Sequence, residues 1–299
     1  MTFKTLLRGV TVAIGISLAT PSLVHAKDPT PVVATFSILG DLVKQIGGKH
    51  ISLTTLVGPD GDAHVYKPTP ADARAVSGAK VLFLNGLEFE GWINRLVDAS
   101  DFKGLRVVST KGIEAIPFGH DHGAFDPHAW QSAENIVIYL DNITAALAKA
   151  DPSNASNFFK NREAYVAKVK ALDAEISAKM KALPEAARTV ITSHDAFGYF
   201  AKRYGLNFEA PQGMSAESEA SAKDVAKLIT QIRKEKIRAV FVETITDNRL
   251  MEQIVRETGA KIGGTLYSDA LSGADGPAGT YLDMMRHNSS TILGALTGT

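Results

Sequence analysis

A long stretch in the middle of the chain, residues 154–183, contains neither glycine nor proline. Apolar side chains recur along this stretch at helical spacing, as Phe158, Tyr165, Val169 and Leu172 illustrate. The pattern predicts a single helix of roughly 28 residues, which would be about 40 Å long at 1.5 Å per residue. Because helices in globular proteins average only about 11–12 residues, we expect this helix to be a rigid strut that joins two lobes.

The sequence on either side of the strut alternates between β-rich apolar runs and amphipathic helical segments. This alternation predicts parallel sheets with right-handed crossovers, so the expected fold class is α/β. We expect two lobes, each with a central, mainly parallel four-stranded sheet, joined by one long rigid α-helix. A short helix should open at His194 and Asp195. The eight predicted strands are residues 31–36, 51–57, 80–85, 105–109, 188–192, 206–210, 239–243 and 261–266.

The first 26 residues have the pattern of a secretory signal peptide. Lys4 and Arg8 supply a positive start, an apolar run from Val10 to Leu18 is too short to span a bilayer, and Val24-His25-Ala26 resembles a cleavage site. The predicted organisation is therefore a signal peptide at 1–26, an N-terminal α/β lobe at 27–152, a linking helix at 153–184 and a C-terminal α/β lobe at 185–299.

Charge and cysteine content narrow the compartment and the partners. The 32 basic residues balance the 32 acidic ones, which argues against nucleic acid or an anionic membrane surface as a partner. The sequence has no cysteine, so an exported chain of this size would fold on its apolar core without disulfides. The signal peptide also lacks the cysteine that bacterial lipoproteins acylate. We expect a free periplasmic monomer without a lipid anchor.

Three of the eight histidines fall within residues 118–130, together with two aspartates and flanking glycine and proline. The histidines are His120, His122 and His128. Imidazole and carboxylate groups on a loop are typical ligands of a transition metal. This local cluster raises the question of whether the rest of the chain supplies further ligands.

Ligands in open α/β sheets bind beyond the carboxyl ends of the strands. Three histidines and one aspartate follow predicted strands and could meet between the lobes: His64, His128, His194 and Asp269. Any one of them alone would more often be a loop or helix-capping residue, apart from His128, for which the two readings are about equal. Their joint placement at four strand ends favours an N3O set of protein ligands, which suits tetrahedral zinc.

Four motifs surround these residues. They are Gly61-Asp-Ala-His64-Val-Tyr-Lys-Pro-Thr-Pro70, Asp126-Pro-His128-Ala-Trp130, Ser193-His194-Asp-Ala-Phe-Gly-Tyr-Phe200 and Leu266-Tyr-Ser-Asp269-Ala-Leu-Ser272. The motifs resemble those of the zinc- and manganese-specific solute-binding proteins of bacterial ABC importers. The resemblance covers essentially the whole mature chain, in order. It implies the two-lobed fold with a bridging helix, and it implies that the same four residues bind the metal.

The resemblance also implies a metal preference and a partner. Manganese-type members carry a carboxylate where this chain has His194, and a third imidazole favours Zn²⁺. We therefore expect periplasmic zinc capture and delivery to a membrane ABC permease, and a periplasmic metallochaperone could be a further partner. The alternatives are a manganese-binding homologue, a zinc hydrolase or an adhesin. A hydrolase would need three protein ligands, a bound water and a general base, whereas four protein ligands fill the shell.

Residues around the four ligands have predicted supporting roles. Zinc-type relatives often have a long histidine- and acid-rich loop, which is short here, so His120 and His122 are either an auxiliary metal site or solvated loop residues. Ligating imidazoles usually need an oriented partner. Glu217, Glu219 and Glu243 are candidates for that role, and Asp195 is a further candidate next to His194.

Overall fold

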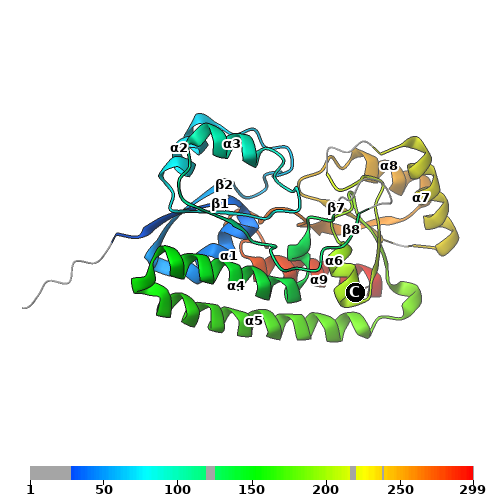
Figure 1. The fold of residues 1–299 in the computed structure, drawn as a ribbon. Coiled ribbons are helices and arrows are strands. Elements are labelled where there is room, and N and C mark those ends of the chain that lie inside the picture. The colour runs from blue at the N-terminus through cyan, green and yellow to red at the C-terminus, as the bar shows by residue number, and fades with distance from the viewer. Residues whose placement is uncertain (1–27, 119–124, 216–219, 238, 299) are drawn as a thin grey trace, which may run out of the picture.

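The computed structural model describes residues 28–118, 125–215, 220–237 and 239–298. These residues form two four-stranded sheets, one in each lobe, with helices around them (Figure 1). Every pairing between the named strands is parallel, so the predicted α/β fold class is confirmed. The predicted signal peptide, residues 1–26, lies outside the described residues.

The N-terminal sheet has the strand order β2-β1-β3-β4. Strand β3 is buried along its whole length, as expected for an inner strand of a parallel sheet. Thr69 caps α2 through a capping box with Asp72, and Pro70 fits the first helical position because that residue needs no N–H donor. The elements are β1 (Thr30–Phe36), α1 (Ser37–Gly47), η1 (Gly48–His50), β2 (Ile51–Val57), α2 (Pro70–Gly78), β3 (Val81–Leu84), α3 (Ile93–Ser100), β4 (Leu105–Val108), η2 (Ala129–Gln131) and α4 (Ala133–Ala150).

The C-terminal sheet repeats this arrangement with the order β6-β5-β7-β8. The helix expected to open at His194 begins only at Gly198, so that prediction is wrong at its start. The reason is tertiary, because Glu243 accepts the His194 N–H and Gly213 accepts the Asp195 N–H. The elements are η4 (Glu185–Ala187), β5 (Thr189–Ile191), α6 (Gly198–Tyr204), β6 (Asn207–Glu209), α7 (Ala222–Glu235), β7 (Ala239–Glu243), α8 (Arg249–Thr258), β8 (Lys261–Leu266) and α9 (Tyr281–Thr297).

Helix α5 (Ala155–Lys181) connects the lobes and follows the short turn η3 (Pro152–Asn154). It is 27 residues long and runs beneath both lobes, along the bottom of Figure 1. It packs against α1 and α4 of the first lobe and against α6 and α9 of the second. The predicted strut is therefore present as one unbroken helix.

One hydrophobic core extends through both lobes. It includes Phe36 of β1, Trp130 of η2, Phe158 of α5, Phe200 of α6 and Tyr281 of α9, all of which are buried. A second, smaller cluster lies between the C-terminal sheet and helices α7 and α8. Because both lobes contribute to the larger core, they pack together as one unit.

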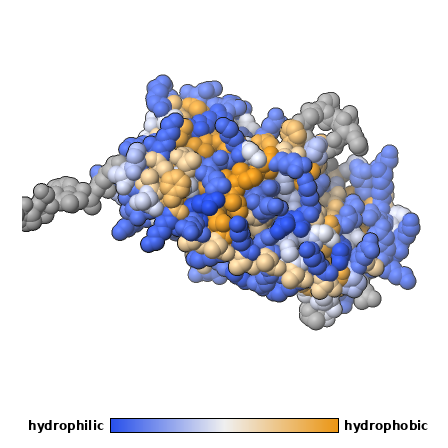
Figure 2. Space-filling view, turned by 60° about the horizontal axis from the view of Figure 1, so that its bottom comes forward, coloured by the Kyte–Doolittle hydropathy of each residue, from blue (hydrophilic) through white to orange (hydrophobic). Residues whose placement is uncertain are grey.

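The visible surface is mostly hydrophilic. Seen from the side of α5, apolar atoms gather mainly near the middle of the face (Figure 2). Within the described ranges, no helix is both long enough and apolar enough to cross a membrane.

Candidate metal centre

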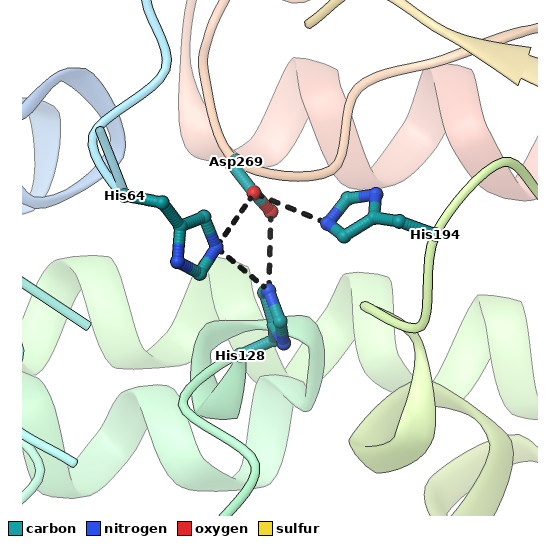
Figure 3. A group of neighbouring side chains, drawn as sticks. All are labelled: His64, His128, His194 and Asp269. Carbon is teal, nitrogen blue, oxygen red and sulfur yellow. Dashed lines mark hydrogen bonds and ion pairs between the residues drawn. The ribbon is translucent and has the colours of Figure 1, made fainter. Parts of the chain in front are cut away.

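Four side chains meet where the two lobes join (Figure 3). His64 lies in the loop after β2, and His128 lies in the loop between β4 and α4. His194 follows β5, and Asp269 follows β8. Because the strands of each sheet are parallel, their carboxyl ends share one edge, and the two edges face the joint. The structure therefore brings together all four residues that the sequence singled out.

The distances within this group are those of a compact ligand set. Nε2 of His64 lies 3.3 Å from Nε2 of His128. The Oδ2 atom of Asp269 lies 3.2 Å from Nε2 of His64 and 3.3 Å from Nε2 of His194. Its other oxygen, Oδ1, lies 3.6 Å from Nε2 of His128. All four candidate donor groups fall within 4.8 Å of one another, close enough to share one ion.

The group is buried, with one side less covered than the others. The side chains of His128, His194 and Asp269 are fully buried, whereas that of His64 is 9% exposed. The His64 ring also lies against Phe89, with 4.5 Å between ring centroids. His64 is therefore the one of the four that an ion from solvent would reach first.

His128 is oriented by Asp126. One oxygen of Asp126 accepts the backbone N–H of His128 and lies 2.7 Å from its Nδ1. A carboxylate at that distance requires a proton on Nδ1, which leaves the lone pair of Nε2 directed at the other three side chains. The loop is fixed further by Asn85, whose side-chain amide donates to the Pro127 carbonyl at 2.9 Å.

His194 is oriented in the same way by Glu243, one of the partners proposed from the sequence. Oε1 of Glu243 accepts the backbone N–H groups of Ser193 and His194, at 2.9 and 3.0 Å. Its Oε2 lies 2.7 Å from Nδ1 of His194. The carboxylate that contacts this ring is thus Glu243 and not the neighbouring Asp195. Glu217 and Glu219 lie outside the described residues.

Asp269 carries the negative charge of the group. Burial alone would raise its pKa, but the charges of His128 and His194 outweigh burial and hold the pKa well below its usual value. Burial would lower the pKa of His194, but the carboxylates of Glu243 and Asp269 raise it well above its usual value. Both directions of the pKa shift favour the charged pair, a protonated His194 opposite an ionised Asp269, when no ion is bound.

The donor set can offer four or five atoms to a cation. Each imidazole presents one Nε2, and the two oxygens of Asp269 both face imidazole nitrogens. One oxygen would complete the four-atom set expected from the sequence. Both oxygens together would give five donors, a number that the sequence argument did not consider.

Asp126 has a role that the sequence did not predict, and the predicted auxiliary site falls in residues that the structure does not describe. The role of Asp126 was not predicted, although its position two residues before a histidine is a readable signal, since the loop can fold back onto its own carboxylate. The auxiliary site predicted at His120 and His122 lies outside the described residues.

The architecture and this centre agree with the resemblance found in the sequence. Two α/β lobes joined by one long helix, with imidazoles and a carboxylate converging at the joint, are what that resemblance to metal-specific solute-binding proteins implied.

Comparison with known proteins identifies the family within this class. Residues 32–295 match the family described as the periplasmic component A of zinc-uptake complexes, and the chain belongs to this family. It is therefore an extracytoplasmic solute-binding protein and not an enzyme, which removes the hydrolase alternative. Proteins of this kind work with a membrane permease and an ATPase.

Relatives of the chain differ in the metal for which they are named. The iron-binding protein YfeA of Yersinia pestis is 35% identical over 263 residues, covering 87% of this chain and 84% of the relative. The manganese-binding lipoprotein MntA of Halalkalibacterium halodurans is 34% identical over 267 residues, covering 89% and 88%. The solved structure of the periplasmic zinc-binding protein TroA from Treponema pallidum has a TM-score of 0.85 and 32% identity, covering 89% and 99%.

Proposed function

We propose that this protein captures Zn²⁺ in the periplasm and delivers it to the permease of an ABC importer. The observation that carries the proposal is the convergence of three imidazole Nε2 atoms and one carboxylate in a buried site. Nitrogen-rich sets of this kind suit zinc better than the oxygen-rich sets preferred by manganese. The proposed ligands are His64, His128, His194 and Asp269. Zn²⁺ is the cargo and takes part in no reaction.

Manganese is the second candidate cargo. The second oxygen of Asp269 faces His128, so the site can supply five donors, and a larger coordination number suits Mn²⁺ better than a tetrahedral one does. Relatives named for manganese and iron align with most of the chain. The alternative therefore deserves a direct competition experiment. No observation at the site favours the adhesin alternative.

The proposed route of the ion follows the burial of the ligands. Capture begins at His64, which alone of the four ligands is partly exposed, and ends with the ion between the lobes. Delivery follows when the carrier, acting as a monomer, docks on its permease. The metallochaperone partner and the auxiliary role of His120 and His122 stay predictions from the sequence.

The finer localisation is also part of the proposal. A free periplasmic protein is expected because the sequence contains no cysteine for acylation, whereas the relative MntA is named a lipoprotein. Recovery of the protein in the osmotic-shock fluid would support this expectation. Retention with the membranes after a high-salt wash would contradict it.

Metal content tests the function most directly. Protein purified without chelator should contain about one zinc ion per chain, because a buried four-residue site retains its ion during purification. Elemental analysis would measure this content, and stripped protein offered Zn²⁺ and Mn²⁺ together would report the preference. Protein that takes up neither ion would overturn the proposal, and a clear preference for Mn²⁺ would replace zinc with the second candidate.

The affinity for zinc should depend strongly on pH. An imidazole binds metal only when its Nε2 is unprotonated, and the pKa of His194 in the metal-free protein is raised well above its usual value, mainly because Glu243 and Asp269 outweigh burial. Lowering the pH favours the protonated, metal-free form, so the affinity should fall as pH falls. Because an unperturbed histidine titrates near about 6.5, the fall should begin above neutral pH.

Competition titrations between about pH 8 and about pH 6 would measure this dependence. Calorimetry in buffers of different ionisation enthalpy should show at least one proton released per zinc bound at neutral pH. An affinity that stays constant over this range, with no proton release, would contradict the assigned protonation of His194.

A further inference from the structure

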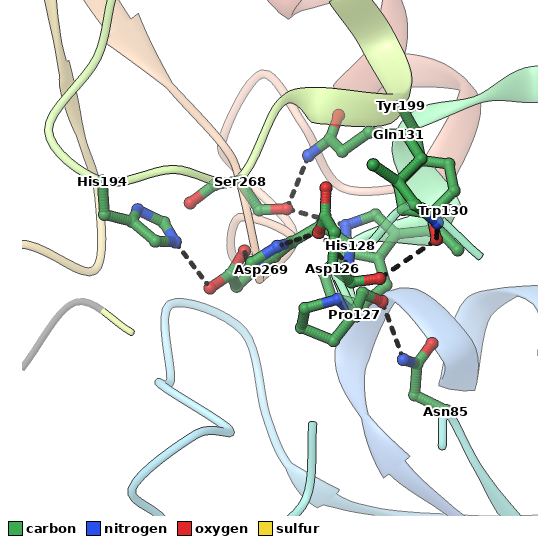
Figure 4. Close-up of polar contacts among 12 residues, drawn as sticks. Asn85, Asp126, Pro127, His128, Trp130, Gln131, His194, Tyr199, Ser268 and Asp269 are labelled. Carbon is green, nitrogen blue, oxygen red and sulfur yellow. Dashed lines mark hydrogen bonds and ion pairs between the residues drawn. The ribbon is translucent and has the colours of Figure 1, made fainter. Parts of the chain in front are cut away.

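Two side chains of the N-terminal lobe converge on the carbonyl next to Asp269 (Figure 4). Nε1 of Trp130 and Nε2 of Gln131 both donate to the Ser268 carbonyl oxygen, each at 2.8 Å. Trp130 and Gln131 lie two and three residues after the proposed ligand His128. A single short segment of the first lobe therefore supplies the ligand His128 and also binds the carbonyl of Ser268. Ser268 precedes the ligand Asp269 in the second lobe.

The burial of Gln131 indicates that its role is to donate this hydrogen bond to the Ser268 carbonyl. Its side chain is fully buried in the shared core, where a polar amide is costly unless it is paired. Its Nε2 meets the Ser268 carbonyl, whereas its Oε1 meets no donor among the described residues. A side chain of similar size without polar atoms would fill the same space at lower cost. The hydrogen bond to the Ser268 carbonyl thus explains why this buried position holds a glutamine and not an apolar residue.

This contact matters for Asp269 because its carboxylate lacks the kind of partner that orients His128 and His194. His128 and His194 are each held by a carboxylate at Nδ1. The oxygens of Asp269 face the three imidazoles, and the described residues offer them no further donor. Its direction must therefore be set by its main chain, and two donors on the Ser268 carbonyl fix the peptide plane from which Asp269 projects.

We propose that Gln131, assisted by Trp130, is a positioning residue for metal binding that aims Asp269 at the three imidazoles from the opposite lobe. The inference rests on the proposed function, because it assigns Gln131 a role at the same site. It extends that function by making the affinity of the site depend on a contact between the lobes that reaches Asp269 through its main chain and not through its carboxylate.

A double-mutant cycle tests the positioning role. Gln131→Met removes the donor at nearly constant volume, and it should weaken zinc binding by roughly 10- to 100-fold, the range typical of outer-shell partners. The thermal unfolding of the metal-free protein should stay close to that of the wild type, because the unpaired Oε1 is removed as well. In an Asp269→Ala background, Gln131→Met should cause no further loss, since it acts through Asp269.

Asn161→Leu provides the matched control. Asn161 donates from its amide to the Ile46 carbonyl at 2.8 Å, a contact between α5 and α1 away from the metal centre, so its loss should leave zinc affinity unchanged. If Gln131→Met folds poorly, Trp130→Phe takes its place in the test. It removes the second donor to the Ser268 carbonyl and should also weaken zinc binding. Unchanged affinity in Gln131→Met, or an equal loss in both backgrounds, would overturn the inference. Failure of the wild type to bind metal would instead count against the proposed function.

Discussion

Replacing His194 by alanine is expected to weaken zinc binding by more than about a hundredfold, beyond the range typical of outer-shell partners. The substitution removes one of three nitrogen donors and leaves Glu243 buried without the imidazole that lies 2.7 Å from its Oε2. Competition titration with a zinc-binding dye would measure the loss. His50→Ala is the control, because His50 packs against Phe158, outside the centre.

The companion substitution His194→Asp should change the metal preference as well as the affinity. A carboxylate in place of the third imidazole gives an oxygen-rich set, so the ratio of zinc to manganese affinity should fall relative to the wild type. Parallel titrations with both metals would show this ratio. If His194→Ala bound zinc as tightly as the wild type, the four-ligand assignment would be wrong.

The second large loss of zinc affinity is expected for Glu243→Gln, which replaces one carboxylate oxygen with an NH₂ group. Glu243→Gln keeps an oxygen for the N–H groups of Ser193 and His194, but it places an amide NH₂ opposite Nδ1 of His194. A donor there forces Nδ1 to accept, so the proton moves to Nε2, the atom that should hold the ion. The opposite orientation of the amide would set its NH₂ against two N–H donors. Zinc affinity should therefore fall by roughly 10- to 100-fold.

Glu243→Ala separates positioning from folding. It leaves the two backbone N–H groups buried without an acceptor, which costs about 1–3 kcal/mol each, so this variant should also unfold more easily. Denaturant unfolding of the metal-free variants should place Glu243→Gln closer to the wild type than Glu243→Ala. Equal zinc affinity in Glu243→Gln and the wild type would show that the tautomer of His194 does not control binding.

The fold could be predicted because its signals are local. Strand and helix alternate with clear apolar periodicity, and no breaker interrupts the long helix, so element types and their order followed from the sequence. The start of the helix after β5 was predicted wrongly because a distant residue decides it. Glu243, 49 positions away, takes the N–H of His194 and holds the backbone out of the helix.

For the candidate site, the four proposed ligands could be predicted from the sequence, but most of the residues that orient them could not. Its four main residues follow predicted strands, and facing lobes would bring those strand ends together, so topology and the family resemblance indicated the same set. Their partners depend on packing between elements that are far apart in sequence. Gln131 and Ser268 are 137 positions apart, and no spacing rule relates them. Asp126 was within reach of sequence reasoning, because it lies two residues from His128.

The core that runs through both lobes would link metal supply to the lifetime of the carrier. Since the lobes share that core and α5 packs on both, an ion bound at their joint would stabilise the whole chain against unfolding. At a free ion concentration a hundred times the Kd, the added stability would be about 2.7 kcal/mol. Proteases attack the small unfolded population, which would shrink by about a hundredfold. Empty carriers would be degraded first, so scarce zinc would lower the number of carriers as well as their occupancy.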